Sequence, residues 1–437
     1  MNIFNLSLQI NGFPIKKATS AYHKIIQLNE EAYPAYLSDC QNAVFNYHLK
    51  NNAFYKTFIG NKKIKSWSDI PVMTKKNMQI PLQDRLSKGF SLSNCYINKT
   101  SGSSGDPFIF AKDKFCHALT WASVFNRFGW YGLNFNNSLQ ARFYGIPLDL
   151  IGNTKERIKD LLSHRYRFSV FDLSDVVFEK TIQVFKQKKF VYINGYTSSI
   201  VLFAKFLEKK NILLKEICPS LRCCVVTSEM LFEEDKKLME TYFGIPVINE
   251  YGASELDIIA FQHPEGDWLI NNETILVEIV DEHNNPLPNG SEGKIVITSL
   301  YNFAHPFIRY EIGDIGIIDE RSTPKKQILK KLIGRTNDIA ILPSGKKSPG
   351  LTFYYVTKSI IEDTGNIKEF IVKQIKIDTF EIEYVSEQPL TKAQMKKIEH
   401  EMFIYLEQGL TIVFSRKQRL ERSKSGKLKQ FQSLINP

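Results

Sequence analysis

The chain has 437 residues, which is more than one hydrophobic core normally serves, so we expect two or three domains. Its 43% apolar and 12% aromatic residues exclude a disordered chain, and no stretch approaches the roughly 18 apolar residues that span a bilayer. The net charge of +11 raises the question of a nucleic-acid binder, but the basic residues are spread widely, so we expect no nucleic-acid partner.

The first twenty residues contain no uninterrupted apolar run that is long enough for a signal peptide, so a cytoplasmic protein without a transmembrane segment is expected. The six cysteines are scattered and show no C-x-x-C spacing. This argues against a zinc site and favours buried free thiols. The oligomeric state is not visible in the sequence, and a homodimer is one option.

Helical periodicity dominates the beginning of the chain. It runs from about residue 20 to residue 50, with Pro34 as an interruption. We interpret residues 1–69 as a helical N-terminal region that packs on the main body. Thr74 stands where it would cap the helix that follows.

A Ser/Gly loop follows at residues 100–107, which read Thr-Ser-Gly-Ser-Ser-Gly-Asp-Pro. Such a loop offers bare backbone N–H groups and short hydroxyls, which together can wrap a phosphate. It is not a Walker A loop, because no lysine follows Gly105, and a flexible linker is the structural alternative. We expect it to join two strands at a sheet edge, ahead of a helix whose aromatic face from Phe115 to Phe128 belongs to the core.

The middle of the chain alternates between strand and helix patterns. The predicted segments are a strand at 190–193, a turn at 194–196, a strand at 223–226, a helix at 231–242 and a strand at 246–248. This alternation is typical of a parallel sheet, in which ligands collect at the carboxyl ends of the strands. Tyr251 and Glu255 lie just past one such end.

The pattern changes after residue 275. Residues 275–280 and 294–299 flank a long turn and predict a hairpin within a smaller β-barrel-like subdomain. Beyond Arg335 the chain resembles a separate α+β domain. Its predicted elements are helices at 351–361 and 391–407 and strands at 370–375, 380–385 and 410–414. We expect a large domain over residues 1–336 and a small one over residues 337–437.

Five motifs follow one another in a fixed order. They are the Ser/Gly loop, Glu250–Glu255, Arg309–Asp314, Gly334–Arg335 and Ser425–Lys427. This ordered set resembles the adenylate-forming superfamily, and within it the phenylacetate–CoA ligases and their relatives in capsule biosynthesis. The resemblance runs from about Ile70 to the C-terminus. It implies an α/β fold: a large domain of stacked parallel-type sheets with helices, and a small α+β domain that swings between two orientations.

The resemblance assigns roles around ATP and Mg²⁺. Four residues of the loop would hold the β- and γ-phosphates: Thr100, Ser103, Ser104 and Gly105. Tyr251 would stack on adenine, and Glu255 would hold Mg²⁺, although an acid at a helix N-terminus is its structural alternative. Ser228 and Glu229 lie where relatives contact the adenine with backbone atoms.

Three further residues complete the predicted site. Asp314 would accept hydrogen bonds from both ribose hydroxyls, with a turn residue as the alternative. Arg335 would reinforce the ribose contact. Lys427 would reach between the carboxylate and the α-phosphate, and one more lysine in a basic tail is its alternative. Arg309 is equally consistent with a functional role and with an ion pair.

The resemblance implies an AMP-forming acid–thiol ligase. The first step would give an acyl-adenylate and pyrophosphate, and the second would pass the acyl group to an acceptor, most simply CoA. The acid would lie among Tyr144, Tyr192, Tyr196, Ser228 and Ala253, a lining that suits an aryl or apolar acid.

Two alternatives stay open. Asn337 stands where the family has an acidic hinge residue, which gives weight to an amine, a hydroxyl or a carrier-protein thiol as the acceptor, as in decoration of a surface polysaccharide. The other alternative is a nucleotide-binding protein that has lost catalysis.

Overall fold

The protein is described by a computed structural model that covers residues 3–99, 109–145, 150–170, 172–335, 339–345, 347–349, 353, 367–422, 428–429 and 431–435. The chain divides into two compact units. The first contains Met1–Ile312 and Ile317–Lys331, and the second contains Gly313–Gly316 and Leu332–Pro437. The domain boundary expected between residues 336 and 337 stays a prediction, because residues 336–338 lie outside the described part.

The first unit begins with helices. They are α1 (Ile3–Ile10), α2 (Ile15–Ile26), α3 (Tyr33–Asn51), α4 (Ala53–Ile59), the 3₁₀ helices η1 (Trp67–Asp69) and η2 (Lys75–Met78), and α5 (Leu82–Arg85). The expected helical region is confirmed, and it is interrupted at residues 27–32, just before Pro34. Pro34 itself lies in the first turn of α3, where its missing N–H costs nothing. Thr74 caps η2 as predicted: its backbone N–H and its hydroxyl donate to Asn77 Oδ1 at 2.9 and 2.8 Å.

Two short antiparallel strands, β1 (Tyr96–Lys99) and β2 (Ile109–Lys112), flank the Ser/Gly loop as the sequence predicts. The loop itself lies outside the described residues. Helix α6 (Lys114–Gly129) follows directly, and the carboxylate of Asp113 caps it by accepting from the N–H groups of Phe115 and Cys116, both at 2.9 Å. Leu119 and Phe128 on α6 are buried, which confirms that this face belongs to the core.

A seven-stranded sheet forms the centre of the first unit, in the order β4-β3-β5-β6-β7-β8-β9. The strands are β3 (Gln140–Phe143), β4 (Arg165–Phe168), β5 (Tyr192–Tyr196), β6 (Cys223–Thr227), β7 (Val247–Ala253), β8 (Asp257–Gln262) and β9 (Trp268–Ile270). The helices between them are α7 (Leu150–Leu162), α8 (Asp175–Gln187), α9 (Thr197–Lys210), α10 (Leu214–Ile217) and α11 (Glu233–Phe243). The strands from β4 to β7 pair in parallel, as the alternating pattern predicts, whereas β8 and β9 are antiparallel.

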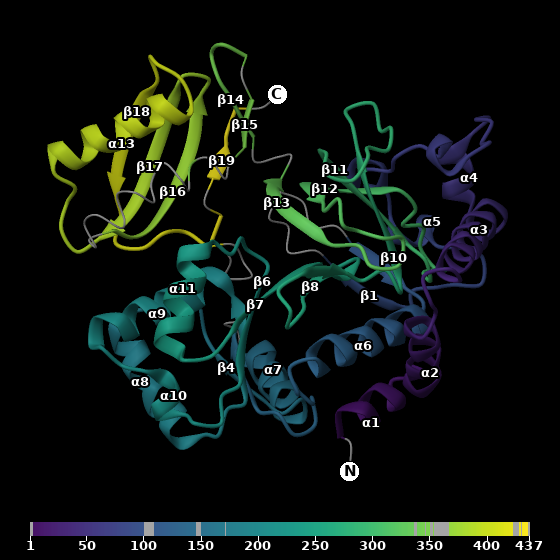
Figure 1. Ribbon diagram of the computed structural model, residues 1–437, viewed down its shortest axis with the longest axis horizontal. Coiled ribbons are helices and arrows are strands. Elements are labelled where there is room, and N and C mark those ends of the chain that lie inside the picture. Colours follow the sequence, from purple (N-terminus) through teal and green to yellow (C-terminus); the bar gives the residue numbers. More distant parts are fainter. Residues whose placement is uncertain are drawn as a thin grey trace. The chain divides into compact units, whose positions relative to one another are not determined.

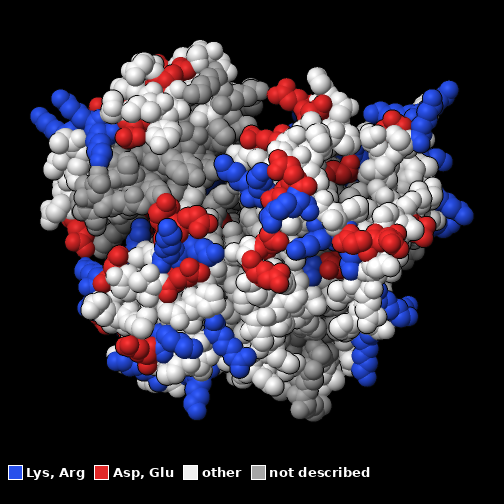
Figure 2. Space-filling model, in the orientation of Figure 1, with Lys and Arg blue, Asp and Glu red and all other residues white. Residues whose placement is uncertain are grey.

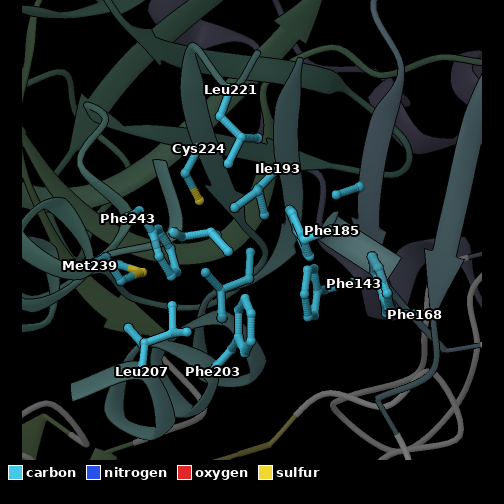
Figure 3. Packing of buried hydrophobic residues seen from close by; sticks show 14 of the residues in the cluster. Phe143, Phe168, Phe185, Ile193, Phe203, Leu207, Leu221, Cys224, Met239 and Phe243 are labelled. Carbon is cyan, nitrogen blue, oxygen red and sulfur yellow. The ribbon is translucent and has the colours of Figure 1, made fainter. Parts of the chain in front are cut away.

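Helices cover both faces of this sheet (Figure 1). Because side chains alternate along β6, Cys224 and Val226 pack in one cluster with residues of α8, α9 and α11. Figure 3 shows this cluster, in which Phe203 of α9 and Phe243 of α11 lie close to the strands. Cys223 and Val225 point the other way and pack with α6. The core therefore has two layers, one on each side of the strands.

The prediction of a turn at residues 194–196 is wrong, because these residues continue β5 to Tyr196. An Asn-Gly pair favours a turn only where no neighbouring strand competes for the backbone. Here β3 lies alongside, and a Cβ on Gly195 would collide with the carbonyl oxygen of Phe143. Gly195 thus allows two strands to approach closely rather than marking the end of one.

A four-stranded sheet follows, in the order β10-β11-β12-β13. Its strands are β10 (Ile275–Val280), β11 (Glu292–Ser299), β12 (Tyr310–Ile318) and β13 (Leu329–Arg335). The predicted hairpin of β10 and β11 is confirmed, with Ile275 opposite Ser299.

The second unit has an α+β fold. Its sheet runs in the order β18-β17-β16-β19, and β14 and β15 form a separate pair. The elements are β14 (Ile339–Ile341), β15 (Lys347–Pro349), β16 (Ile367–Lys376), β17 (Thr379–Ser386), α13 (Lys392–Tyr405), β18 (Thr411–Arg416) and β19 (Phe431–Ser433). The predicted strands and the second helix are confirmed, whereas the helix expected at 351–361 falls almost wholly outside the described residues. The mixed α/β fold class is confirmed.

Candidate functional site

The carboxyl ends of three parallel strands bring several predicted residues together. The register pairs Tyr196 of β5 with Thr227 of β6, and Thr227 with Glu250 of β7, so these residues stand in one row across the sheet. Ser228 and Tyr251 each follow that row by one residue. Residues up to 55 positions apart in the chain therefore meet at one edge, which is where ligands bind in sheets of this type.

The segment after β6 has an unusual backbone. Ser228 has a φ of 72°, in the left-handed region, where a residue with a side chain is uncommon. Glu229 has a structural task, because its Oε2 accepts from the backbone N–H of Ser198 at 2.7 Å, at the start of α9. Its main-chain oxygen accepts from Thr197 Oγ1 at 3.3 Å. The Glu229 side chain is thus committed to the helix, and only the backbone contact with adenine, as predicted, stays available to it.

Tyr251 and Glu255 belong to the hairpin of β7 and β8. A register shift lies between Tyr251 and Gly252, and a Cβ on Gly252 would lie 2.6 Å from the carbonyl oxygen of Asp257. Only glycine fits this close approach. Tyr251 is buried, and its ring centroid lies 6.1 Å from that of Trp268 in an edge-on contact.

Glu255 lies in the turn of this hairpin and is only 7% exposed. The strand β8 follows it, so an acid at a helix N-terminus, its structural alternative, is excluded. Burial raises the pKa of its carboxyl, while the charges of Lys112 and Lys75 and a hydrogen bond from the Tyr310 hydroxyl at 3.3 Å act in the opposite direction.

This environment fits a cation. Desolvation leaves the negative charge of Glu255 only partly compensated, and a bound divalent ion would restore it. The described residues contain no group of three or more His, Cys, Asp or Glu side chains that could hold a metal alone. Such an ion would take its remaining ligands from water or from a bound molecule.

The buried Lys112 and the partly buried Asp257 form an ion pair beside Glu255, and the sequence did not point to either residue. The hydroxyl of Thr120 also donates to the Asp257 carboxylate. Asp257 has a φ of 63°, so the hairpin turns sharply where this pair is made. Lys112 lies 145 positions before its partner, and no local pattern could have linked the two.

The residues expected around the acid fall into two groups. The rings of Tyr144 and Tyr196 lie 4.5 Å apart at the strand ends, and Ala253 ends β7. Tyr192 lies at the opposite, amino end of β5, in the cluster with Phe128 of α6. Four residues along a strand span about 13 Å, so Tyr192 is not brought together with the other three.

Two predicted nucleotide residues lie on the second sheet. Asp314 is on β12 and buried, and Arg335 is the last residue of β13. The side chain of Arg335 is outside the described part, as are Thr100, Ser103, Ser104, Gly105, Asn337 and Lys427. Their roles stay predictions.

Arg309 has a structural role. Its Nη1 donates to the carbonyl oxygens of Ser68 and Ile70, both at 2.7 Å, and its Nη2 donates to that of Asn284 at 3.0 Å. Its Nε forms an ion pair with Glu278 at 3.3 Å. The ion-pair interpretation of this residue is confirmed.

Comparison with known proteins gives a consistent picture, although no protein-family model matches the chain. Protein CapK of Staphylococcus aureus is 30% identical over 151 residues, 33% of this chain and 31% of CapK. A phenylacetate-coenzyme A ligase of Aromatoleum evansii is 28% identical over 131 residues, and one of Thermus thermophilus is 25% identical over 185 residues. The matches span 29% and 40% of those two ligases, so the similar part is well under half of each relative.

Solved structures share the fold along more of the chain. A 2-hydroxyisobutyryl-CoA ligase in the postadenylation state has a TM-score of 0.70 at 16% identity and covers 93% of this chain and 90% of its own. An anthranilate CoA ligase in complex with anthranoyl-AMP has a TM-score of 0.54 at 15% identity, over 76% of this chain and 64% of its own. At these identities the likeness shows a common fold. None of the described helices has the length and apolar character that crossing a bilayer requires.

Proposed function

We propose that this chain, which belongs to the adenylate-forming superfamily, activates a carboxylic acid with ATP to give an acyl-adenylate and pyrophosphate, and then transfers the acyl group to CoA. One observation carries the proposal: the register of β5, β6 and β7 assembles Tyr196, Thr227 and Glu250 in one row, directly before Ser228 and Tyr251. The similarity to phenylacetate-coenzyme A ligases supports it.

In this proposal the first unit holds the adenine, the phosphates and the acid. Tyr251 stacks on adenine, and the backbone of Ser228 and Glu229 borders it. Glu255 contributes one carboxylate to Mg²⁺, which would neutralise part of the phosphate charge. The Ser/Gly loop binds the β- and γ-phosphates through Thr100, Ser103, Ser104 and Gly105. Tyr144, Tyr196 and Ala253 border the acid.

The remaining roles belong to the later motifs of the ordered set. Asp314 and Arg335 bind the ribose, and Lys427 places its ammonium between the carboxylate and the α-phosphate. Adenylation brings two anions together, so a cation at that point lowers the barrier by electrostatics and position rather than by proton transfer. A cytoplasmic location is part of the proposal.

Exchange of labelled pyrophosphate into ATP, measured with a broad panel of carboxylic acids, tests the first step. We expect exchange that requires an acid and that falls by at least about 100-fold in Lys427→Ala, the loss typical when one group that stabilises developing charge is removed. Lys424→Ala, three residues earlier in the same basic tail, is the matched control and should retain exchange. If no acid in the panel supports exchange, the proposal is overturned, and a rise in melting temperature with ATP alone would then favour a non-catalytic nucleotide binder.

The acceptor has a second candidate. Similarity to protein CapK and the presence of Asn337 at the expected hinge favour an amine, a hydroxyl or a carrier-protein thiol, as in decoration of a surface polysaccharide. Incubating the acyl-adenylate with CoA and with amino sugars, and identifying the products by mass spectrometry, separates the two. We expect the CoA thioester, and its absence alongside an amide or ester would favour the second candidate.

A nucleic-acid partner is not part of the proposal. On the face shown in Figure 2, Lys and Arg side chains lie among Asp and Glu side chains instead of gathering in one basic stripe. A protein that binds nucleic acid through its phosphates normally concentrates basic residues on one face.

A further inference from the structure

A pocket of about 290 Å³ lies within the first unit. Its walls come from the beginning of α3, from the segment that joins β9 to β10, and from the loop between β12 and β13. None of the described residues that line it is among those that we propose to bind ATP, Mg²⁺ or the acid. The pocket is therefore a place where a second molecule could bind, apart from the residues of the candidate functional site.

The lining of this pocket is neutral. Among the described residues that line it, none is Asp, Glu, Lys, Arg or His. The charged groups nearby are engaged with other partners: Glu30 accepts from Thr323 Oγ1 at 3.1 Å, and Lys326 forms an ion pair with Asp267 at 3.3 Å. A charged ligand would lose its hydration here without meeting an opposite charge, which is costly. The lining therefore favours an uncharged ligand, and it disfavours ATP, CoA and a carboxylate.

Asn272 contributes a buried acceptor without a partner. Its side chain is 3% exposed and lines the pocket. Its Nδ2 donates to the carbonyl oxygens of Pro324 and Lys325, both at 3.1 Å, and this fixes the orientation of the amide group. Its Oδ1 is buried and accepts no hydrogen bond. A buried acceptor of this kind lowers stability until a donor reaches it.

Three more polar side chains of the lining can still form hydrogen bonds. The amide groups of Asn289 and Gln327 form none with the rest of the described chain. Ser322 Oγ accepts from the N–H of Ile328 at 2.9 Å, so its own hydrogen stays free to be donated. An amide group offers an acceptor oxygen and two N–H donors, and a hydroxyl offers both functions in one atom. The pocket thus presents donors and acceptors together.

The remaining lining is aliphatic, and the walls are fixed. Leu37, Ile275 and Leu276 contribute apolar surface. The loop between β12 and β13 is held to the end of β9, because the N–H of Ile270 donates to Gln327 O at 3.0 Å. Ligand pockets usually measure about 300–1,000 Å³, so this one is at the lower end and has room for a single ring rather than for a nucleotide.

We infer that this pocket binds a neutral monosaccharide. A sugar ring carries hydroxyls that both donate and accept, which matches the amide groups of Asn289 and Gln327 and the hydroxyl of Ser322. Its C–H groups pack on aliphatic side chains, and it brings no charge into a neutral pocket. An apolar ring would leave the polar lining without partners. The inference goes beyond the proposed function and does not depend on it.

The test titrates sugars into the full chain without ATP or an acid, with isothermal titration calorimetry as the measurement. The neutral probes are glucose, galactose, mannose and N-acetylglucosamine, and the charged probes are glucuronate and glucosamine. We expect at least one neutral sugar to bind with a Kd of about 1 mM or lower. Both charged sugars should bind at least tenfold more weakly than the best neutral one. If no neutral sugar binds, or if a charged sugar binds equally well, the inference is overturned.

Variants connect the binding to the pocket. Gln327→Leu should raise the Kd at least about threefold, the loss expected for one hydrogen bond, and Gln327→Leu/Asn289→Leu at least about tenfold. Neither side chain bonds to the rest of the described chain, so both variants should fold, and their melting temperatures check this. Gln187→Leu is the matched control, since Gln187 is an exposed glutamine at the end of α8, and the Kd should not change there.

Two further outcomes bear on the location of the sugar. An unchanged Kd in Gln327→Leu/Asn289→Leu would show that the sugar binds elsewhere, and displacement of the sugar by ATP and Mg²⁺ would show that it occupies the nucleotide site. Either result overturns the inference, and binding that persists in the presence of ATP supports it. Because the titration needs no turnover, absence of pyrophosphate exchange would overturn the proposed function and leave this inference intact.

Discussion

Arg309 and Arg142 are both arginines of the first unit, and they differ in how their donors are used. Arg309 donates through its Nη atoms to three backbone carbonyl oxygens, and its Nε forms an ion pair with Glu278 without a hydrogen bond. Arg142 has one hydrogen bond, of 3.4 Å, and a ring beneath it. The Arg309 guanidinium links the loops around residues 68–70 and 284 to the sheet that contains β10. The Arg142 guanidinium makes no such links to other segments among the described residues.

The comparison divides buried polar groups into those that stabilise the fold and those that are available to a ligand. A group whose donors and acceptors are all matched by the protein acts on stability, because removing it leaves its partners buried and unpaired. A buried polar group that has a donor or an acceptor without a partner lowers the free energy of unfolding slightly. A bound ligand that supplies the missing partner can restore this loss. The four predictions below test this division, which also applies to His48 and Glu255.

Replacing Arg309 should have the largest effect on folding. In Arg309→Met, Glu278 and three carbonyl oxygens lose their partner in the interior, so we expect the free energy of unfolding in urea to fall by about 3–5 kcal/mol. The double variant Arg309→Met/Glu278→Leu should recover part of this loss, since it removes the unpaired charge. If the free energy of unfolding fell by less than 1 kcal/mol in the single variant, the assignment of Arg309 to the stabilising groups would be wrong.

His48 is a neutral group of the matched kind, and it should make the fold sensitive to acid. It is fully buried, with Nε2 2.8 Å from Asn302 O and Nδ1 3.0 Å from Ser87 Oγ, and burial lowers its pKa to about 4. A folded pKa below the unfolded value of about 6.5 means that the unfolded chain binds the proton first. The contribution of His48 to stability is therefore present above pH 6.5 and is lost as the pH falls towards 4.

The size of the loss of stability in acid follows from the difference between the folded and unfolded pKa values of His48. A difference of about 2.5 pKa units corresponds to a loss on the order of 3 kcal/mol between pH 7.5 and pH 4. Urea unfolding of the wild type and of His48→Gln across this range measures it, because other acid-sensitive groups contribute equally to both. We expect the dependence on pH to be flatter in the variant by this amount. Equal slopes in the two proteins would show that His48 is not held neutral.

Glu255 should behave in the opposite way, with a large effect on activity and none on folding. Burial of its charge already disfavours the ionised form, so Glu255→Gln should leave the melting temperature unchanged or slightly higher. Pyrophosphate exchange should fall by about 100-fold or more, because the carboxylate that we propose as a ligand of Mg²⁺ is lost.

Asp257→Asn is the matched control for Glu255, two residues further along the same hairpin. It leaves the buried ammonium of Lys112 with a neutral partner, so its main effect should be a lower melting temperature. Exchange within threefold of the wild type in Glu255→Gln would remove this residue from the proposed site.

Much of the fold could be predicted from the sequence, because the signals are local. Runs such as residues 223–226 and 275–280 are apolar and bounded by polar residues, and both are strands. The turn predicted at 194–196 failed for a non-local reason, since the close approach of Phe143 decides what Gly195 does. Local chemistry cannot show which strand lies alongside.

The same limit applies to the site. The motif around Tyr251 and Glu255 was readable because its members lie within five residues. The partners of Glu255, Lys112 and Tyr310, come from 143 positions before it and 55 positions after it, and only the folded chain brings them together. Arg142 gave one local signal, a charge inside a buried strand pattern, but whether its donors are used depends on neighbouring strands.

The smallest effect on stability is expected for Arg142→Met, and it completes the comparison with Arg309. The variant removes one long hydrogen bond and the contact with the Tyr144 ring, and it also removes a buried donor that has no acceptor. These contributions oppose each other, so the free energy of unfolding should change by less than about 1 kcal/mol. Urea unfolding at pH 7.5, run beside Arg309→Met, measures both arginines under one condition. A loss as large as that of Arg309→Met would show that Arg142 stabilises the fold in the same way, and the division between the two arginines would be wrong.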